Sequence, residues 1–133
     1  MALRVEVSVG EFLDKLSILE IKSERITDAA KLANVRKELA LLQETWAGSP
    51  HAQTDISAQR LALKQVNEAL WEIEDEIRRQ EAARDFGEKF VALARSVYQQ
   101  NDLRAAIKKE INTLLGSDLT EEKSYVDYSD PTG

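Results

Sequence analysis

A capping box near the N-terminus fixes where the first helix of this chain begins. Ser8 is followed three residues later by Glu11, and each side chain can satisfy a backbone N–H that the first helical turn leaves without a partner. We therefore predict a helix over residues 8–27. Five apolar side chains fall on one wide arc of this helix, the face that must be buried. They are Phe12, Leu13, Leu16, Leu19 and Ile26.

Apolar side chains at alternating spacings of three and four continue through most of the chain. They predict a second helix over residues 29–46, a long third helix over 56–83 and a fourth that ends at Gln100. A fifth helix is predicted over 103–114, because without a break at 101–102 the later stripe would rotate away from the earlier one. The predicted fold class is all-α, an antiparallel bundle of four or five helices.

The two ends of the chain differ from the helical body. Leu3, Val5 and Val7 alternate with polar residues, a pattern that indicates a short extended N-terminal lead-in. At the other end, residues 117–133 lack a helical period and carry five acidic side chains against one lysine, which accounts for most of the net charge of −6. We therefore predict one bundle domain over residues 1–116, followed by an acidic, partly ordered tail.

Composition and motifs exclude several functional classes. The 133 residues include no cysteine, and no apolar run approaches the roughly 20 residues of a membrane span, so a cytoplasmic protein is expected. Nucleic-acid binding is not expected, because the chain lacks a dense basic face. His51, the single histidine, lies in a loop beside Gly48 and Pro50, which does not fit the Glu-x-x-His pairs of di-iron bundles. Phosphate-binding glycine loops and nucleophile motifs are missing, so we predict neither a metal nor a cofactor.

Several polar side chains lie within the apolar arcs of the predicted helices, where an isolated charge is very costly. Glu20 does so in the first helix, Glu74 in the third and Arg104 in the fifth. A bundle can bury these three arcs together only if the charges compensate or open to water, so we predict that the three residues are neighbours. The candidate ligand-binding residues are Glu20, Asn67, Trp71, Glu74, Arg78, Asn101, Arg104 and Lys108.

Two interpretations of this polar cluster are open. It is either a buried ion-pair network that fixes the register of the helices, or a pocket that binds an anionic or hydroxylated ligand. The structural interpretation is favoured, because charges embedded at helical spacing usually pair with one another first. Trp71 either packs on a second helix layer or flanks the pocket.

Three blocks of sequence span most of the chain: VSVGEFLDKLSILEIKSERI, NEALWEIEDEIR, and YQQNDLRAAIKKEINTLLGS together with EEKSY. These blocks resemble a family of small, uncharacterised helical bacterial proteins. The resemblance implies an accessory role beside glycosyltransferase and cell-surface polysaccharide functions, and it implies that the blocks form one site. It assigns no catalytic residue.

Two functions of different class follow from these features. The first is a non-enzymatic interaction or accessory protein that acts on a protein partner or on a second copy of itself, as a homodimer. Ile18 and Ile21 are its candidate interface, because they form a second apolar patch opposite the main stripe of the first helix. The alternative is a small helical enzyme or ligand-binding protein of the chorismate-mutase kind, which holds an anionic metabolite through embedded Arg, Lys and Glu side chains. An accessible pocket lined by Arg104 and by Glu20 or Glu74 would favour the alternative.

Overall fold

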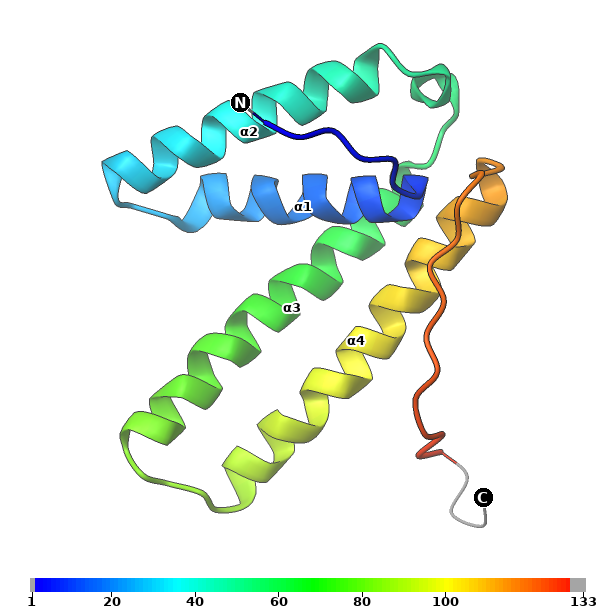
Figure 1. Ribbon diagram of the computed structural model, residues 1–133. Coiled ribbons are helices and arrows are strands. Elements are labelled where there is room, and N and C mark those ends of the chain that lie inside the picture. The colour runs from blue at the N-terminus through cyan, green and yellow to red at the C-terminus, as the bar shows by residue number, and fades with distance from the viewer. Residues whose placement is uncertain (1, 130–133) are drawn as a thin grey trace.

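A computed structural model describes residues 2–129; residue 1 and residues 130–133, the end of the predicted tail, lie outside the described residues. Residues 2–129 contain four α-helices, one short 3-10 turn and no strand (Figure 1). The elements are α1 (Val9–Arg25), α2 (Ala29–Ala47), η1 (Pro50–Gln53), α3 (Ser57–Ala82) and α4 (Glu88–Leu114). The predicted all-α helical bundle is confirmed.

The helices form two antiparallel hairpins, α1 with α2 and α3 with α4, which meet at one end and diverge from it (Figure 1). α1 is the central element, because it packs on each of the other three α-helices. α2 packs on α1 and η1 but, within the described part of the chain, reaches neither α3 nor α4. Accordingly, none of the residues of α2 is fully buried.

The hydrophobic core lies where the two hairpins meet. Its buried residues come from α1, α3 and α4 and from the residue before α3: Leu13, Leu16, Ile56, Leu63, Val66, Leu70, Ile107 and Ile111. α1 begins at this end of the molecule. The predicted N-cap is present there, because Oγ of Ser8 accepts a hydrogen bond from the backbone N–H of Glu11 at 3.1 Å. The N-terminus of α1 is therefore anchored at the core, while its C-terminal half contacts α3 through ion pairs of Glu20, Glu24 and Arg25.

The predicted break at residues 101–102 is wrong, because α4 runs without interruption from Glu88 to Leu114. Its early part packs on α3: Leu93 lines a groove with Ile73 of α3, and Lys89 pairs with Glu76 at 2.8 Å. Its later residues, including Ile111, pack in the core beside α1. The apolar stripe rotates along the helix because the partner changes, not because the helix stops.

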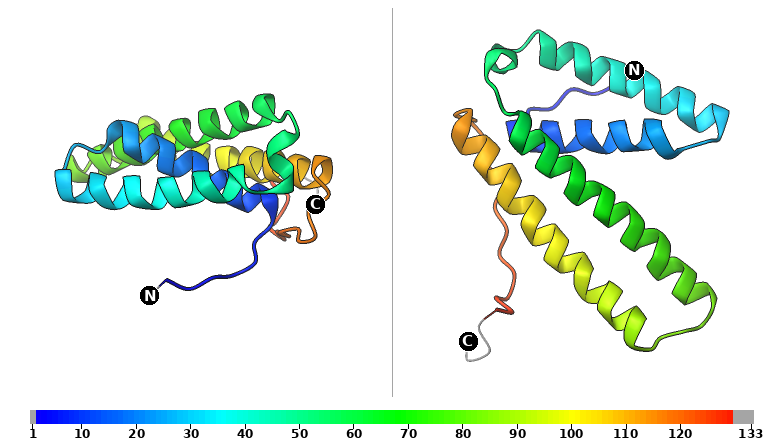
Figure 2. Two further views of the ribbon diagram at one scale, coloured as in Figure 1. Left: turned by 90° about the horizontal axis from the view of Figure 1, so that it is seen from above. Right: turned by 180° about the vertical axis from the view of Figure 1, so that it is seen from behind.

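The segments before α1 and after α4 lie outside the helices. Residues 2–7 form neither helix nor strand, and they leave the helical body as an extended segment (Figure 2). The tail turns back after α4 and follows that helix (Figure 1). The ring of Tyr128 packs edge-on against Tyr98 with centroids 4.8 Å apart, whereas Tyr125 is 79% exposed. The tail is thus attached to α4 at particular residues, without secondary structure of its own.

Candidate functional site

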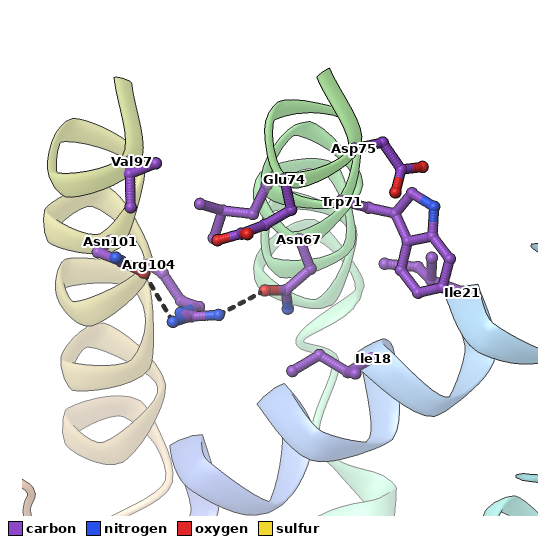
Figure 3. A pocket seen from close by; sticks show the side chains of 10 residues that line it. Ile18, Ile21, Asn67, Trp71, Glu74, Asp75, Val97, Asn101 and Arg104 are labelled. Atoms are coloured by element: carbon purple, nitrogen blue, oxygen red, sulfur yellow. Dashed lines mark hydrogen bonds between the residues drawn. The ribbon is translucent and has the colours of Figure 1, made fainter. Parts of the chain in front are cut away.

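The diverging hairpins leave a cleft of about 460 Å³ between α1, α3 and α4 (Figure 3). Apolar side chains form part of its wall, and polar side chains of α3 and α4 form the rest. The lining residues are Ile18, Ile21, Asn67, Leu70, Trp71, Glu74, Asp75, Val97, Asn101 and Arg104. A cleft of this size and mixed lining is typical of small-molecule sites.

Arg104, on α4, directs its guanidinium group into the cleft (Figure 3). One terminal nitrogen donates to Oδ1 of Asn67 at 3.0 Å, and the other donates to Oδ1 of Asn101 at 2.7 Å. Both acceptors are neutral amides, and within residues 2–129 no carboxylate oxygen lies within 4.0 Å of the guanidinium. The cation is therefore oriented but not neutralised, and these two bonds leave further N–H donors for another acceptor.

Asn67 holds Arg104 in this orientation because α1 fixes the Asn67 amide. Its side chain is buried, and Nδ2 donates to Oδ1 of Asp14 and to Oγ of Ser17, each at 2.8 Å. The amide oxygen must then face Arg104. The Asn67 amide also separates the buried carboxylate of Asp14 from the guanidinium, so the two charges do not pair directly.

A second polar cluster, centred on Lys108, lies beside the cleft. The Lys108 side chain is 10% exposed; its ammonium group hydrogen-bonds to Glu11 of α1 and to Glu121 of the tail, and Asp14 lies 3.8 Å away. Burial lowers the pKa of Lys108, but its bonds to Glu11 and Glu121 outweigh burial, and the net pKa lies above the ordinary value. Lys108 thus joins α4 to α1 and to the tail.

Gly10 brings α1 and α4 into backbone contact next to this cluster. The Gly10 N–H, which the first helical turn leaves without a helical partner, donates to Oδ1 of the buried Asn112 at 2.7 Å. A Cβ atom on Gly10 would lie 2.5 Å from the carbonyl oxygen of Lys108. A glycine is therefore required for the close approach that places Lys108 against the first turn of α1.

The tail and α4 together line a second cavity, of about 760 Å³, that Arg104 also borders. Arg104 and Asn101 line both this cavity and the cleft between the hairpins. The remaining lining residues are Tyr98, Asp102, Lys123, Tyr125, Val126 and Tyr128. The hydrogen bond between Tyr128 and Asp102 raises the pKa of the Tyr128 phenol. Arg104 therefore borders two adjoining cavities.

The attachment of the tail is expected to depend on pH. The hydrogen bond from Lys108 lowers the pKa of Glu121 below its ordinary value of 4.5, so the contact is complete above about pH 4.5 and is lost as pH falls through the lowered pKa. We expect the Tyr98–Tyr128 ring contact to be lost over the same range, as NMR shifts of the ring protons would show. Glu121→Gln should loosen the tail at neutral pH, whereas Glu122→Gln should not. Unchanged ring shifts in Glu121→Gln would refute this link.

Comparison with known proteins assigns the chain to a family. Residues 3–132 match DUF6165, a family of unknown function. The chain belongs to the DUF6165 family. No curated protein and no solved structure matches it. The uncharacterised family predicted from the three sequence blocks is therefore confirmed, and its site must be understood from the residues themselves.

In this DUF6165 protein the structure brings five of the eight candidate ligand-binding residues to one cleft: Asn67, Trp71, Glu74, Asn101 and Arg104. Lys108 lies in the adjoining buried cluster. Arg78 pairs with Glu74 but is largely exposed and does not line the cleft. The choice left open for Trp71 is resolved, because its side chain flanks the cleft (Figure 3).

The predicted proximity of Glu20, Glu74 and Arg104 is wrong for Glu20, whereas Glu74 and Arg104 line the same cleft. Glu20 pairs with Arg60 at 3.3 Å and lines a separate groove beside the first turns of α3. α1 crosses α3, so residues on neighbouring positions of α1 face different parts of α3. Helical projection places Glu20 in the apolar arc but cannot show where along the neighbouring helix that arc lies.

The candidate interface at Ile18 and Ile21 is not an exposed apolar patch. Ile21 is 1% exposed, and both residues line the wall of the cleft. The reason is that α1 packs on α2 from one side and on α3 and α4 from another, so it has two buried faces. Ile21 is thus covered within the chain, whereas Ile18 is half-buried at the cleft.

Three buried polar residues of the site were not among the sequence candidates: Asp14, Ser17 and Asn112. A signal for two of them exists, because Gly10, Asp14, Ser17 and Ile21 recur at spacings of four, three and four along α1. Small and polar side chains at helical spacing indicate a face that approaches another backbone closely. Asn112 has no comparable signal, since its role depends on the position of the Gly10 N–H.

The described residues were also compared with the requirements of a metal site and of a membrane-spanning helix. Among residues 2–129, no group of three or more His, Asp or Glu side chains is placed to hold a metal ion. None of the described helices combines the length and apolar character that crossing a bilayer requires. His51 stacks on Trp46 with ring centroids 6.2 Å apart and is half-buried, so it is less solvated than its loop position suggests.

Proposed function

We propose that this protein is a non-enzymatic, ligand-binding accessory protein whose cleft holds an anionic, hydroxylated small molecule, with the anionic group on Arg104. The observation that carries the proposal is the guanidinium itself, which is oriented by Asn67 and Asn101 and lacks a carboxylate partner in the described residues. Charge-assisted hydrogen bonds to Arg are short, directional and about twice as strong as neutral ones. A carboxylate or phosphate is the natural complement of this group.

The rest of the lining favours a ligand that also has hydroxyl groups and an apolar face. Asp75 and Glu74 supply carboxylate acceptors for hydroxyl groups on the α3 side of the cleft. Trp71, Ile18 and Ile21 supply apolar wall, and an indole ring can cover the less polar face of a ring-shaped ligand. An acidic sugar combines these three properties: an anion, several hydroxyl groups and a ring with an apolar face.

The biological setting that we propose is bacterial cell-surface polysaccharide synthesis in the cytoplasm, as an accessory to a glycosyltransferase. Its support is the sequence resemblance of the three blocks together with the chemistry of the cleft, because acidic sugars are building units of such polymers. The presence of a cleft lined by Arg104 and Glu74 favours ligand binding over an interaction surface alone. Conversion of the ligand during the binding assay would instead support the chorismate-mutase kind of enzyme.

Binding of matched sugars tests the proposal. We expect glucuronate or a hexose 1-phosphate to raise the melting temperature and to bind measurably by calorimetry, whereas neutral glucose, which lacks the anion, should bind at least tenfold more weakly. Arg104→Gln should weaken binding of the acidic sugar by about 10- to 100-fold, the equivalent of a lost charge-assisted hydrogen bond. The control is Arg95→Gln, an exposed arginine on the same helix, which should bind normally.

Stability separates this proposal from a structural ion-pair network. Because Arg104 bonds to two neutral amides, Arg104→Gln should lower the free energy of unfolding by only about 1 kcal/mol. A buried structural ion pair would instead lose about 3–5 kcal/mol when one partner is removed. A large loss of stability, or equal affinity of the Arg104→Gln variant for the acidic sugar, would contradict the proposal.

A further inference from the structure

The N-terminal arm, residues 2–7, exposes apolar side chains that the rest of the described chain does not cover. Leu3 is 95% exposed, Val5 82% and Val7 45%. Within residues 2–129, no hydrogen bond joins the arm to another segment. The arm stands away from the helices (Figure 2). Its backbone groups and its apolar edge are thus both available for pairing with an extended strand.

An apolar groove lies at the base of the arm. Val7 lines it together with Val9, Phe12, Trp46 and His51, and the ring centroids of Phe12 and Trp46 lie 6.1 Å apart. The volume of the groove is about 170 Å³. An apolar cavity of about 150 Å³ holds one benzene molecule, so this groove has room for one aliphatic side chain.

We propose that the arm pairs with the arm of a second copy of this chain as an antiparallel two-stranded ribbon, and that Leu3 of each copy enters the Phe12–Trp46 groove of the other. In the register that places Val5 opposite Val5, Arg4 of one copy faces Glu6 of the other, twice. Leu3 then faces Val7 of the other copy, which already lines the groove. The arm is therefore complementary to itself in both charge and apolar character.

This complementarity selects a second copy and an antiparallel arrangement. A parallel, in-register pair would place Arg4 against Arg4 and Glu6 against Glu6, and like charges directly opposite one another are destabilising. Antiparallel pairing also puts the two α1 helices at opposite ends of the ribbon, and it creates a symmetric two-fold interface. A two-stranded ribbon alone is only marginally stable in water, so the groove contact of Leu3 must provide much of the affinity.

Charge exchange tests the pairing by sedimentation equilibrium of the full chain. We expect the wild type to dimerise, and Arg4→Glu or Glu6→Arg alone to weaken the dimer by about tenfold or more, because each replaces two attractive pairs with two repulsive ones. An equimolar mixture of the two variants should restore association as a heterodimer. Arg36→Glu, which makes the same charge change at an exposed position of α2, should dimerise like the wild type.

A second variant tests the groove. Leu3→Ser should weaken the dimer. The fluorescence of Trp46 should change when the dimer dissociates on dilution. Circular dichroism should show unchanged helicity for every variant, since the arm lies outside the helices. A wild type that is monomeric at all concentrations overturns the inference, and so does a dimer that is indifferent to the charge exchanges. A dimer that responds to the charge exchanges but not to Leu3→Ser overturns the groove contact.

Discussion

Lys108→Met should lower the free energy of unfolding by about 3–5 kcal/mol, the usual consequence of removing one partner from a buried ion pair. The Lys108 side chain is 10% exposed, and the Asp14 side chain beside it is 8% exposed. Methionine preserves most of the apolar volume of the lysine but leaves the Asp14 carboxylate buried without a cation. Chemical denaturation monitored by circular dichroism would measure the loss.

Two controls separate burial of charge from loss of side-chain bulk. Lys109→Met changes an exposed neighbour on the same helix and should alter stability by less than about 0.5 kcal/mol. The double variant Lys108→Met with Asp14→Asn should recover part of the loss, because no carboxylate is then left unpaired at position 14. If the loss in the double variant equals or exceeds the sum of the losses in the two single variants, Lys108 does not act through Asp14.

The contribution of Lys108 should also disappear at high pH. Its pKa in the folded state lies above the ordinary value of 10.5, so its stabilising effect is fully present below about pH 10.5 and is lost as pH rises through the raised pKa. The difference in stability between wild type and Lys108→Met should therefore be constant from neutral pH to about pH 10 and shrink above it. A difference that already shrinks near pH 8 would show that another group is responsible.

Gly10→Ala is the second substitution with a large expected effect, a loss of about 1–3 kcal/mol through overpacking. In an ordinary helical position the same change stabilises by roughly 0.5–1 kcal/mol. Here the new Cβ would lie 2.5 Å from the carbonyl oxygen of Lys108, and neither backbone can yield without separating α1 from α4. That separation would also stretch the bond between the Gly10 N–H and Asn112.

Gly48→Ala provides the matched control for Gly10. A Cβ on Gly48 would meet its nearest neighbour at an ordinary 3.6 Å, and the backbone there is right-handed. Its melting temperature should be unchanged or slightly raised. If Gly10→Ala proves as stable as Gly48→Ala, the close approach of α1 and α4 is not required by the fold.

Local signals predicted the helices better than they predicted their packing. The capping box at Ser8 and the apolar stripes placed the first three helices within two residues of their observed limits, because caps and periodicity depend only on nearby residues. The break predicted in the last helix was wrong, since a rotating stripe has two causes. A helix that changes partner along its length produces the same pattern as two helices.

The site was predicted only in part, because local patterns show which side chains share a helix face but not how the helices pack. Asn101 and Arg104 were identified because they are polar side chains within apolar arcs, and Asn67 because it shares a stripe of α3 with Glu74. The structure joins Asn67, Asn101 and Arg104 by hydrogen bonds. Glu20 was misplaced, because projection gives the direction of a side chain around a helix but not the crossing point of two helices. Asp14 was missed because the prediction examined the second face of α1 only for the apolar side chains Ile18 and Ile21, whereas the buried Asp14 is polar.

The contact between α1 and α4 has a consequence for folding during synthesis on the ribosome. Glu11 and Gly10 find their partners 97 and 102 residues later in the chain, on the helix that is made last. At translation rates of about 5–20 residues per second, the first helix waits roughly 5–20 s for α4. Meanwhile the α1–α2 hairpin can form, yet its face toward α3 and α4 exposes Leu16 and an uncompensated Asp14. The native contacts of α1 are thus completed only after residue 112 has emerged from the ribosome, and until then the α1–α2 hairpin exposes a surface that a chaperone would cover.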